Sequence, residues 1–210
     1  MPENQVININ GVDIEWDTSR GCFTFFGTPS ALFWINPSLL TMLQPLAEEI
    51  GFDLFRLKVA ASASIGTEED YHAMVTVLGE TFEEGFLKWG EAVSGAGWGV
   101  FEILNFQYDA QKARVRVSNT WELLMQQNLN EKWGCPFIQG KIIGIFSKAL
   151  GVNCWADEIE ICYDKTNSFV EFDIYKSDKT ILKEIESERI KSMQEKERHL
   201  SIEVESKTSE

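Results

Sequence analysis

The stretch from Trp133 to Phe172, WGCPFIQGKIIGIFSKALGVNCWADEIEICYDKTNSFVEF, decides the fold of this chain. It begins with a Cys-Pro turn and continues as an amphipathic helix that ends at Gly151, because glycine readily adopts the left-handed conformation found just past helix ends. Two short segments of alternating polar and apolar residues follow, and the first contains Cys162. Such alternation is typical of strands with one buried face. The stretch therefore predicts a helix followed by a two-stranded hairpin.

The rest of the chain adds helices and antiparallel strands around this unit. Residues 5–26 alternate and contain the turn signal Asn10-Gly11, which predicts two N-terminal strands. The segments VFEILNFQYD and KARVRVSN predict a second pair of strands, joined to the preceding helix by the flexible SGAGWG. Helices are predicted to end at Gly51 and to cover about 53–64, 67–93 and 120–131. The expected fold class is α+β, an antiparallel sheet packed against several helices.

Composition and charge narrow the range of functions. The chain has 210 residues, 44% hydrophobic and 12% aromatic, which is typical of a globular protein. Its net charge of −14 disfavours binding to nucleic acid or to anionic membranes. No apolar run could span a bilayer, and the N-terminus does not resemble a leader, so we expect a cytoplasmic protein. The four cysteines form no CxxC pair, so free thiols or metal ligands are expected.

The chain changes character at Lys176. Residues 178–210 contain no glycine, proline or aromatic residue, and their apolar positions step by three and four. The stepped positions are Ile190, Met193, Leu200 and Val204, with the acidic Glu197 occupying one place in the series. This spacing favours a coiled-coil or signalling helix over a solvated tail, since a polar single helix is marginally stable alone. We therefore divide the chain into a domain at 1–175 and a helical linker at 176–210, which we expect to form a homodimer and to lead to an output domain.

With these features the chain resembles the 4-vinyl reductase-like sensor domain found at the N-terminus of activators that respond to aromatic compounds. The resemblance covers roughly residues 14–175 and rests on the Cys-Pro helix and hairpin, on Gly21 and Phe23, and on the Leu39-to-Gly51 helix. It implies a small-molecule sensor of a signal-transduction protein, not an enzyme. It implies an apolar or aromatic ligand held between the 67–93 helix, the 99–118 strands and the 135–150 helix.

Candidate ligand-binding residues come from the resemblance and from the aromatic hinge. Trp121 matches a tryptophan that lines the family's pocket, and Phe137 matches an aromatic residue after the family's zinc cysteine. Trp89, Trp98 and Phe101 lie near the glycine-rich hinge and are candidate pocket walls, or ordinary core residues. The family's histidine that reaches a phenolic hydroxyl has no counterpart around 93–104, so a more apolar or differently polarised ligand is expected.

The resemblance also raises the question of a zinc site. Cys135 and Cys162 match two of the family's cysteine ligands, and Glu158 or Glu160 could serve as the carboxylate with a shift in register. The third cysteine position is occupied by Val170, and a structural zinc site normally has four protein ligands. Buried cysteines that act as small apolar residues are the alternative, so no cofactor is expected.

Other functions remain open at this point. A protein-interaction or assembly module with a filled pocket would show a packed interior and an exposed apolar face. A haem-based gas sensor would need an axial ligand, and His72 is the sole realistic candidate. An enzyme acting on a tetrapyrrole or similar substrate is disfavoured, because no acid/base pair stands out.

Overall fold

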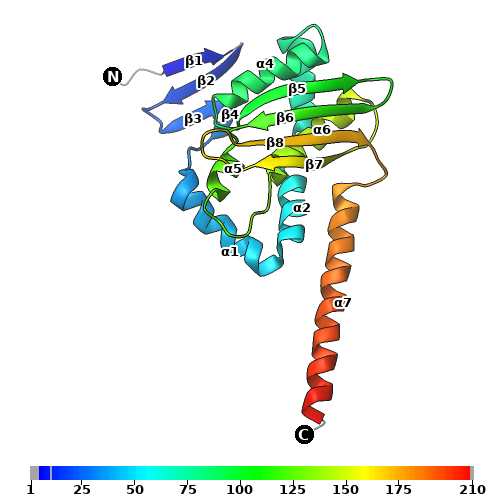
Figure 1. Cartoon of the computed structure of the whole chain (residues 1–210). Helices are drawn as coiled ribbons and strands as arrows, with labels where there is room; N and C mark the ends of the chain where they lie inside the picture. The colour runs from blue at the N-terminus through cyan, green and yellow to red at the C-terminus, as the bar shows by residue number, and fades with distance from the viewer. Residues whose placement is uncertain (1–4, 10, 209–210) are drawn as a thin grey trace.

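The computed structural model describes residues 5–9 and 11–208, apart from the side chains of residue 196 and of residues 199–208. Within this part the chain forms two antiparallel four-stranded sheets and seven α-helices, which confirms the α+β class (Figure 1). The elements in chain order are β1 (Gln5–Ile9), β2 (Val12–Asp17), β3 (Cys22–Phe25), β4 (Thr28–Ser30), the π-helical turn η1 (Ile35–Leu39), α1 (Leu40–Ile50), α2 (Phe52–Ala63), α3 (Thr67–Ala73), the π-helical turn η2 (Met74–Leu78), α4 (Phe82–Ser94), β5 (Val100–Gln107), β6 (Lys112–Ser118), α5 (Trp121–Gln126), α6 (Pro136–Ala149), β7 (Cys154–Cys162), β8 (Phe169–Lys176) and α7 (Ile181–Thr208).

The N-terminal sheet has more strands than predicted. It has the order β1-β2-β3-β4, whereas the alternation in residues 5–26 predicted two strands. The turn predicted at Asn10-Gly11 is described only at Gly11, which has a φ of 85°, because Asn10 lies outside the described residues. The β3–β4 turn is formed by Phe26 and Gly27, whose φ angles are 53° and 68°. Positive φ at both central residues is the geometry of a tight hairpin turn, which asparagine and glycine favour and phenylalanine does not.

The main sheet has the order β5-β6-β8-β7 and contains both predicted strand pairs. In β6, Ala113, Val115 and Val117 are buried, while Arg114 and Arg116 between them lie on the opposite face, opposite Asp173 and Glu171 of β8. Helix α4 packs against β5, and α6 packs against β7 and β8. One face of the sheet is therefore apolar and covered by helices, and the other face is polar.

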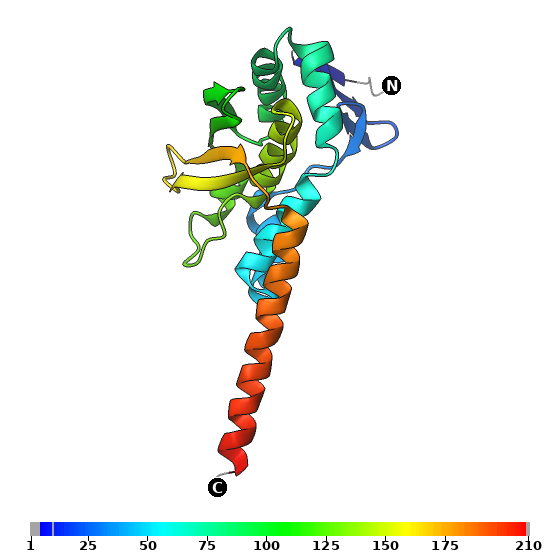
Figure 2. The same ribbon diagram turned by 90° about the vertical axis from the view of Figure 1, so that its right-hand side faces the viewer.

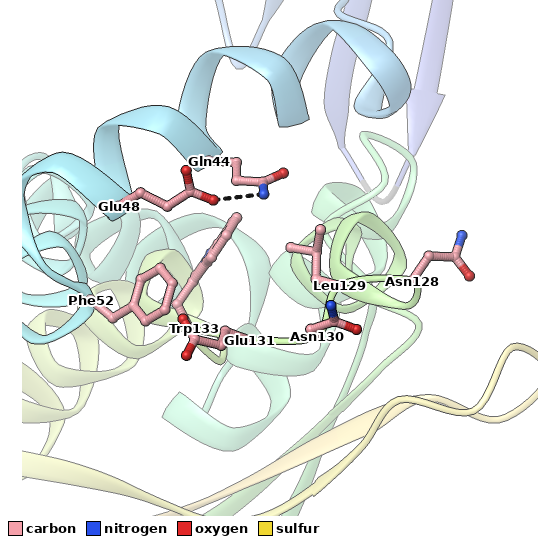
Figure 3. Close-up of a pocket in the computed structure, with 8 residues that line it drawn as sticks. All are labelled: Gln44, Glu48, Phe52, Asn128, Leu129, Asn130, Glu131 and Trp133. Carbon is pink, nitrogen blue, oxygen red and sulfur yellow. Dashed lines mark hydrogen bonds between the residues drawn. The ribbon is translucent and has the colours of Figure 1, made fainter.

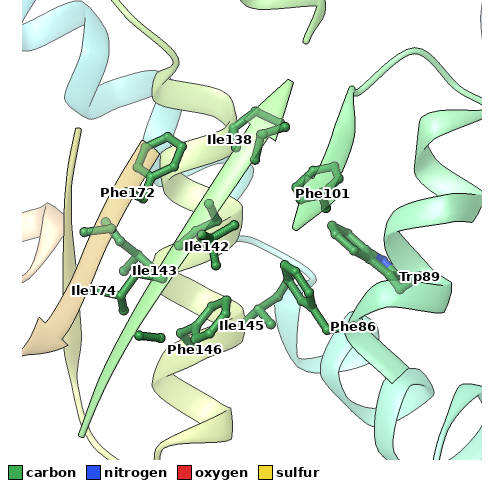
Figure 4. Packing of buried hydrophobic residues seen from close by; sticks show 14 of the residues in the cluster. Phe86, Trp89, Phe101, Ile138, Ile142, Ile143, Ile145, Phe146, Phe172 and Ile174 are labelled. Carbon is green, nitrogen blue, oxygen red and sulfur yellow. The ribbon is translucent and has the colours of Figure 1, made fainter. Parts of the chain in front are cut away.

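The core lies between this sheet and the helices α4 and α6. Figure 4 shows Phe86 and Phe101 facing Phe146 and Ile142 in this region. The rings of Phe86 and Phe146 are 5.3 Å apart at an angle of 69°, and those of Phe86 and Phe101 are 5.9 Å apart at 83°. These edge-to-face arrangements are favourable aromatic contacts. Burial of the apolar face of α6 explains why this helix follows the sequence prediction closely.

The predicted helix over 67–93 is broken in the structure. Gly79 has extended dihedral angles, φ −146° and ψ 165°, and separates η2 from α4. Thr81 then caps α4, because its side chain accepts a hydrogen bond from the Glu84 backbone N–H at 3.2 Å. A Cβ atom on Gly85 would lie 2.0 Å from the Met74 carbonyl oxygen. The chain therefore folds back on itself through close backbone contact, and the apolar stripe predicted for one helix is shared by α3, η2 and α4.

Helix α7 leaves the body at the end of the main sheet and extends well beyond it (Figures 1 and 2). Its beginning packs against α2, where Ile181 is buried and Ile185 is partly buried against the core. The predicted seam residues Leu200 and Val204 lie outside the described side chains. Among the described residues, no helix has an apolar stretch long enough to cross a bilayer.

Candidate functional site

The aromatic residues predicted to bind ligand form one continuous run of ring contacts. The ring of Trp121 lies 5.7 Å from that of Phe137, which lies 4.9 Å from that of Trp98. Trp98 contacts Trp89 at 6.0 Å, and Trp89 contacts Phe101 at 5.3 Å. The structure thus brings all five together from α4, β5, α5, α6 and the glycine-rich turn. Their role in binding a ligand stays a prediction.

Burial divides this aromatic run into a core part and an accessible part. Trp89 is 0% exposed and Phe101 is 6% exposed, and Figure 4 shows both among the packed core residues. Trp98, Trp121 and Phe137 are partly buried. Trp89 and Phe101 therefore act as core residues in this structure, and the side chains open to a ligand lie at the other end of the run.

Trp98 also lines a cleft of about 570 Å³ between the N-terminal sheet and the helices. We call it the hairpin cleft, because the β3–β4 hairpin forms one of its walls. Helix α3, the end of α4 and helix α6 provide the rest. The lining residues are Phe25, Phe26, Thr28, Ser30, Gly66, Glu69, Asp70, Ala73, Val93, Trp98 and Lys141. Aromatic rings with a few charged groups are typical of small-molecule sites.

The charged groups of the hairpin cleft are connected to the aromatic run. Lys141 Nζ donates a hydrogen bond to Asp70 Oδ2 at 2.8 Å, and Trp89 Nε1 donates to Asp70 Oδ1 at 3.3 Å. Lys141 Nζ also lies 5.6 Å from the centre of the Trp98 ring. The lysine and aspartate side chains are 12% and 22% exposed, so an ion pair partly shielded from water lies beside the half-buried tryptophan.

A second cluster of polar residues surrounds the start of α6. The Glu122 carboxylate accepts hydrogen bonds from the backbone N–H groups of Phe137 at 2.9 Å and Ile138 at 3.0 Å. Burial raises the pKa of Glu122 to about 8, although these two hydrogen bonds lower it. Because the first N–H groups of a helix lack partners within it, Glu122 satisfies donors that would otherwise be buried and unpaired.

Glu158 holds the same region from the main sheet. Its Oε1 accepts a hydrogen bond from the Cys135 backbone N–H at 2.6 Å, and its Oε2 pairs with Arg56 Nη2 at 2.7 Å. Burial raises the pKa of the Cys135 thiol well above its usual value, and the Glu122 and Glu158 carboxylates add to this effect. A thiol in this environment stays protonated and unreactive.

The predicted metal ligands Cys135, Cys162 and Glu160 are not assembled. A bulge between Glu158 and Glu160 shifts the pairing of β7 with β8, so that Glu158 pairs with the buried Phe172 and faces the core. Glu160 pairs with Glu171 and Cys162 with Phe169, which places both on the polar face, across the sheet from Cys135. Among the described residues, no group of three His, Cys, Asp or Glu side chains could hold a metal ion. The residues therefore do not fit the zinc site that the resemblance implied.

His72 and a second groove lie outside these two clusters. His72, the candidate haem ligand, is exposed on α3. A separate groove of about 450 Å³ lies between α1 and the loop after α5, and Figure 3 shows Phe52 and Trp133 in it beside Gln44 and Glu48. Its remaining lining is mainly polar, so it matches an apolar ligand less well than the hairpin cleft does.

Sequence reasoning gave no site role to Lys141, Glu122 or Arg56. Lys141 lies four residues after Phe137, one helical turn along α6, and this spacing was a signal that it could share the face of the aromatic ring. Arg56 and Glu158 are separated by 102 positions in the chain. No local pattern predicts such a pair.

Comparison with known proteins shows the fold. No protein-family model matches the sequence, and no curated protein matches it. Among solved structures, the chain is similar to the phenol-responsive sensory domain of the transcription activator PoxR with phenol. The two are 14% identical with a TM-score of 0.60, and the similarity covers 76% of this chain and 84% of the other. This chain therefore has the same fold as that sensory domain, as the sequence resemblance implied.

Proposed function

We propose that this chain is a ligand-binding sensory domain that receives a small aromatic or apolar molecule and acts as a receptor, not as an enzyme. The observation that carries the proposal is the aromatic run from Trp121 to Phe101, which reaches the hairpin cleft through Trp98. The solved domain with the same fold is phenol-responsive. A receptor role is also supported by the environment of Cys135, in which burial keeps the thiol protonated and unsuited to act as a nucleophile.

A path for relaying ligand binding runs from α6 through α2 to α7. Helix α6 carries Phe137 and Lys141, and its Gly140 lies against α2, where a Cβ atom would come within 2.1 Å of the Ala60 carbonyl oxygen. Helix α2 in turn contacts α7 near Ile181. Backbones packed this closely transmit a displacement of one helix to the next. A ligand that favours one position of α6 would thus shift the population of α7 positions.

The relay is proposed to act on a homodimer formed by α7 and to reach a signalling output domain. Ile181, Ile185 and Ser192 lie on the side of α7 that is less exposed. Ile190 and Met193 are 48% and 64% exposed. At about 100° per residue, Ile190 lies roughly opposite Ile181 on the helix. The apolar positions spaced for a coiled coil therefore begin on the face turned away from the body, which leaves Ile190 and Met193 open to a second copy.

Native mass spectrometry of the purified chain, beside a denatured control, tests the proposal. We expect a non-covalent additional mass after incubation with small aromatic compounds, on a dimeric species. The variant Trp98→Ala should lose this mass, whereas Trp155→Ala, a substitution on the main sheet away from the cleft, should retain it. An unchanged mass with every aromatic compound would refute the receptor role. A monomer that still binds ligand would refute only the dimeric relay.

One observation favours a second function, a protein-interaction module. Leu32, Phe33 and Trp34 follow one another between β4 and η1 and are 75%, 69% and 77% exposed. Consecutive large apolar side chains at the surface are typical of interaction sites. If the domain acts in this way, replacing the three with serine should abolish self-association or partner binding in sedimentation experiments and leave aromatic-ligand binding unchanged.

A further inference from the structure

The hairpin cleft contains one cation with unused hydrogen-bonding capacity. A lysine ammonium has three N–H donors, and among the described residues Lys141 donates one hydrogen bond, to Asp70. The Trp98 ring lies beside the same ammonium group. Both carboxylate oxygens of Asp70 already accept hydrogen bonds, one from Lys141 and one from Trp89. Within this ion pair, Lys141 therefore keeps N–H donors for a ligand, whereas both oxygens of Asp70 are already engaged.

The balance of charge in the cleft disfavours an anion. Lys141 is the sole cation among the lining residues, against the carboxylates of Asp70 and Glu69. A ligand carboxylate would add a third negative charge beside one positive charge, in a protein whose net charge is −14. It would also have to displace Asp70 from Lys141, which would leave the aspartate partly buried without its cation. Breaking such a pair is costly.

The remaining lining selects for an aromatic ring. Phe25, Phe26 and Trp98 all contribute to the cleft, and the Phe25 and Phe26 rings contact each other edge to face at 4.8 Å and 86°. Phe26 adopts a φ of 53°, which is uncommon for a bulky residue. Backbone strain of this kind clusters at ligand clamps. At the turn of the hairpin, the positive φ of Phe26 places its aromatic side chain on the cleft.

From these features we propose that Lys141, positioned by Asp70, is the polar recognition point of the hairpin cleft. The cleft takes a neutral aromatic compound with a carbonyl oxygen, such as an aryl ketone or an aryl amide, in preference to the corresponding carboxylate. The ring packs against Trp98 and the two phenylalanines, and the carbonyl oxygen accepts a hydrogen bond from Lys141. This inference rests on the proposed function, since it names the ligand class of the same domain.

Calorimetric titration of the full chain with acetophenone, benzamide, toluene and benzoate tests the inference. Because a hydrogen bond to a charged group is stronger than one between neutral groups, wild type should bind acetophenone and benzamide at least about tenfold more tightly than toluene. In Lys141→Met this preference should disappear, while the affinity for toluene stays within about twofold. Lys148→Met is the matched control, because Lys148 lies two turns further along α6 and pairs with the exposed Glu68. It should behave as wild type.

The variant Asp70→Asn provides a second test, in which binding of benzoate should become tighter. Asparagine keeps an oxygen that can accept from Trp89 but removes the negative charge beside Lys141. The affinity for benzoate relative to acetophenone should therefore rise about tenfold. A ketone preference that survives in Lys141→Met, or tighter binding of benzoate than of acetophenone by wild type, would overturn this inference alone. If wild type binds none of the compounds, toluene included, the proposed receptor function is overturned as well.

Discussion

Buried Glu122 should give this domain a stability that falls as the pH rises. Burial raises the pKa of its carboxyl group to about 8 in the folded protein, whereas an unfolded chain has a glutamate pKa of about 4.3. Between these values the folded state binds a proton that the unfolded state has released. The free energy of unfolding must therefore decrease with increasing pH across this window, and the decrease ends above the folded-state value.

The magnitude follows from the same two pKa values. Each pH unit inside the window lowers the free energy of unfolding by about 1.4 kcal/mol. From pH 5 to pH 7.5, Glu122 should thus remove about 3 kcal/mol, which is a large share of the about 5–15 kcal/mol typical of a folded protein. The variant Glu122→Gln cannot ionise, and its amide oxygen can still accept a hydrogen bond from the start of α6. Its stability should lack this component of the pH dependence.

Urea unfolding followed by tryptophan fluorescence measures the effect at pH 5, 6, 7 and 7.5. Wild type should lose about 3 kcal/mol more than Glu122→Gln over this range. The control Glu131→Gln changes an exposed glutamate in the neighbouring loop and should keep the wild-type pH dependence. If wild type and Glu122→Gln lose stability in parallel, Glu122 is ionised in the folded state throughout the range, and the reasoning from burial is wrong.

Further substitutions test the packing and the turn. Arg56→Met should destabilise the fold by about 2–3 kcal/mol in urea unfolding, because it leaves Glu158 buried without its cation; a change below about 0.5 kcal/mol would contradict this. Gly140→Ala should cost about 2 kcal/mol despite the better helix propensity of alanine, because its Cβ would clash with the Ala60 carbonyl oxygen; unchanged stability would show that α6 and α2 separate easily. Phe26→Asn should stabilise the hairpin turn by a few tenths of a kcal/mol or more and weaken binding of every aromatic ligand in calorimetry; unaltered affinity would remove Phe26 from the site. Ile190→Glu should convert the proposed dimer to a monomer in sedimentation experiments without loss of thermal stability, and a persisting dimer would exclude this face of α7.

Local patterns predicted most elements correctly but failed where chain segments meet. The strands β5 to β8 and the helix α6 were recognised because their alternation and periodicity reflect burial on one face. The break at Gly79 was missed, since one glycine within a continuous apolar stripe is compatible with a helix. It forms because Gly85 allows the backbone at Met74 to approach closely, which is a tertiary contact. The division at residue 176 stays a prediction.

The bulge in β7 shows the same limit for the candidate site. Strict alternation places Glu158, Glu160 and Cys162 on one face, where a carboxylate and the Cys162 thiol could share a metal ion. The extra residue, Ile159, lets Glu158 turn toward the core while Glu160 stays on the polar face. Bulges depend on the partner strand and on what the side chain can reach, and Glu158 reaches Arg56 and the Cys135 backbone.

The sequence by itself determined the fold class, the hairpin after α6 and the polar final helix, because these depend on the composition and period of neighbouring residues. Only the tertiary structure decided which aromatic rings are core and which are accessible, and that Lys141 and Asp70 meet beside Trp98. Only the tertiary structure placed Glu122 at the start of α6. These features depend on contacts between groups far apart in the chain. The energies of those contacts depend on burial and on interatomic distances, which no local sequence pattern specifies.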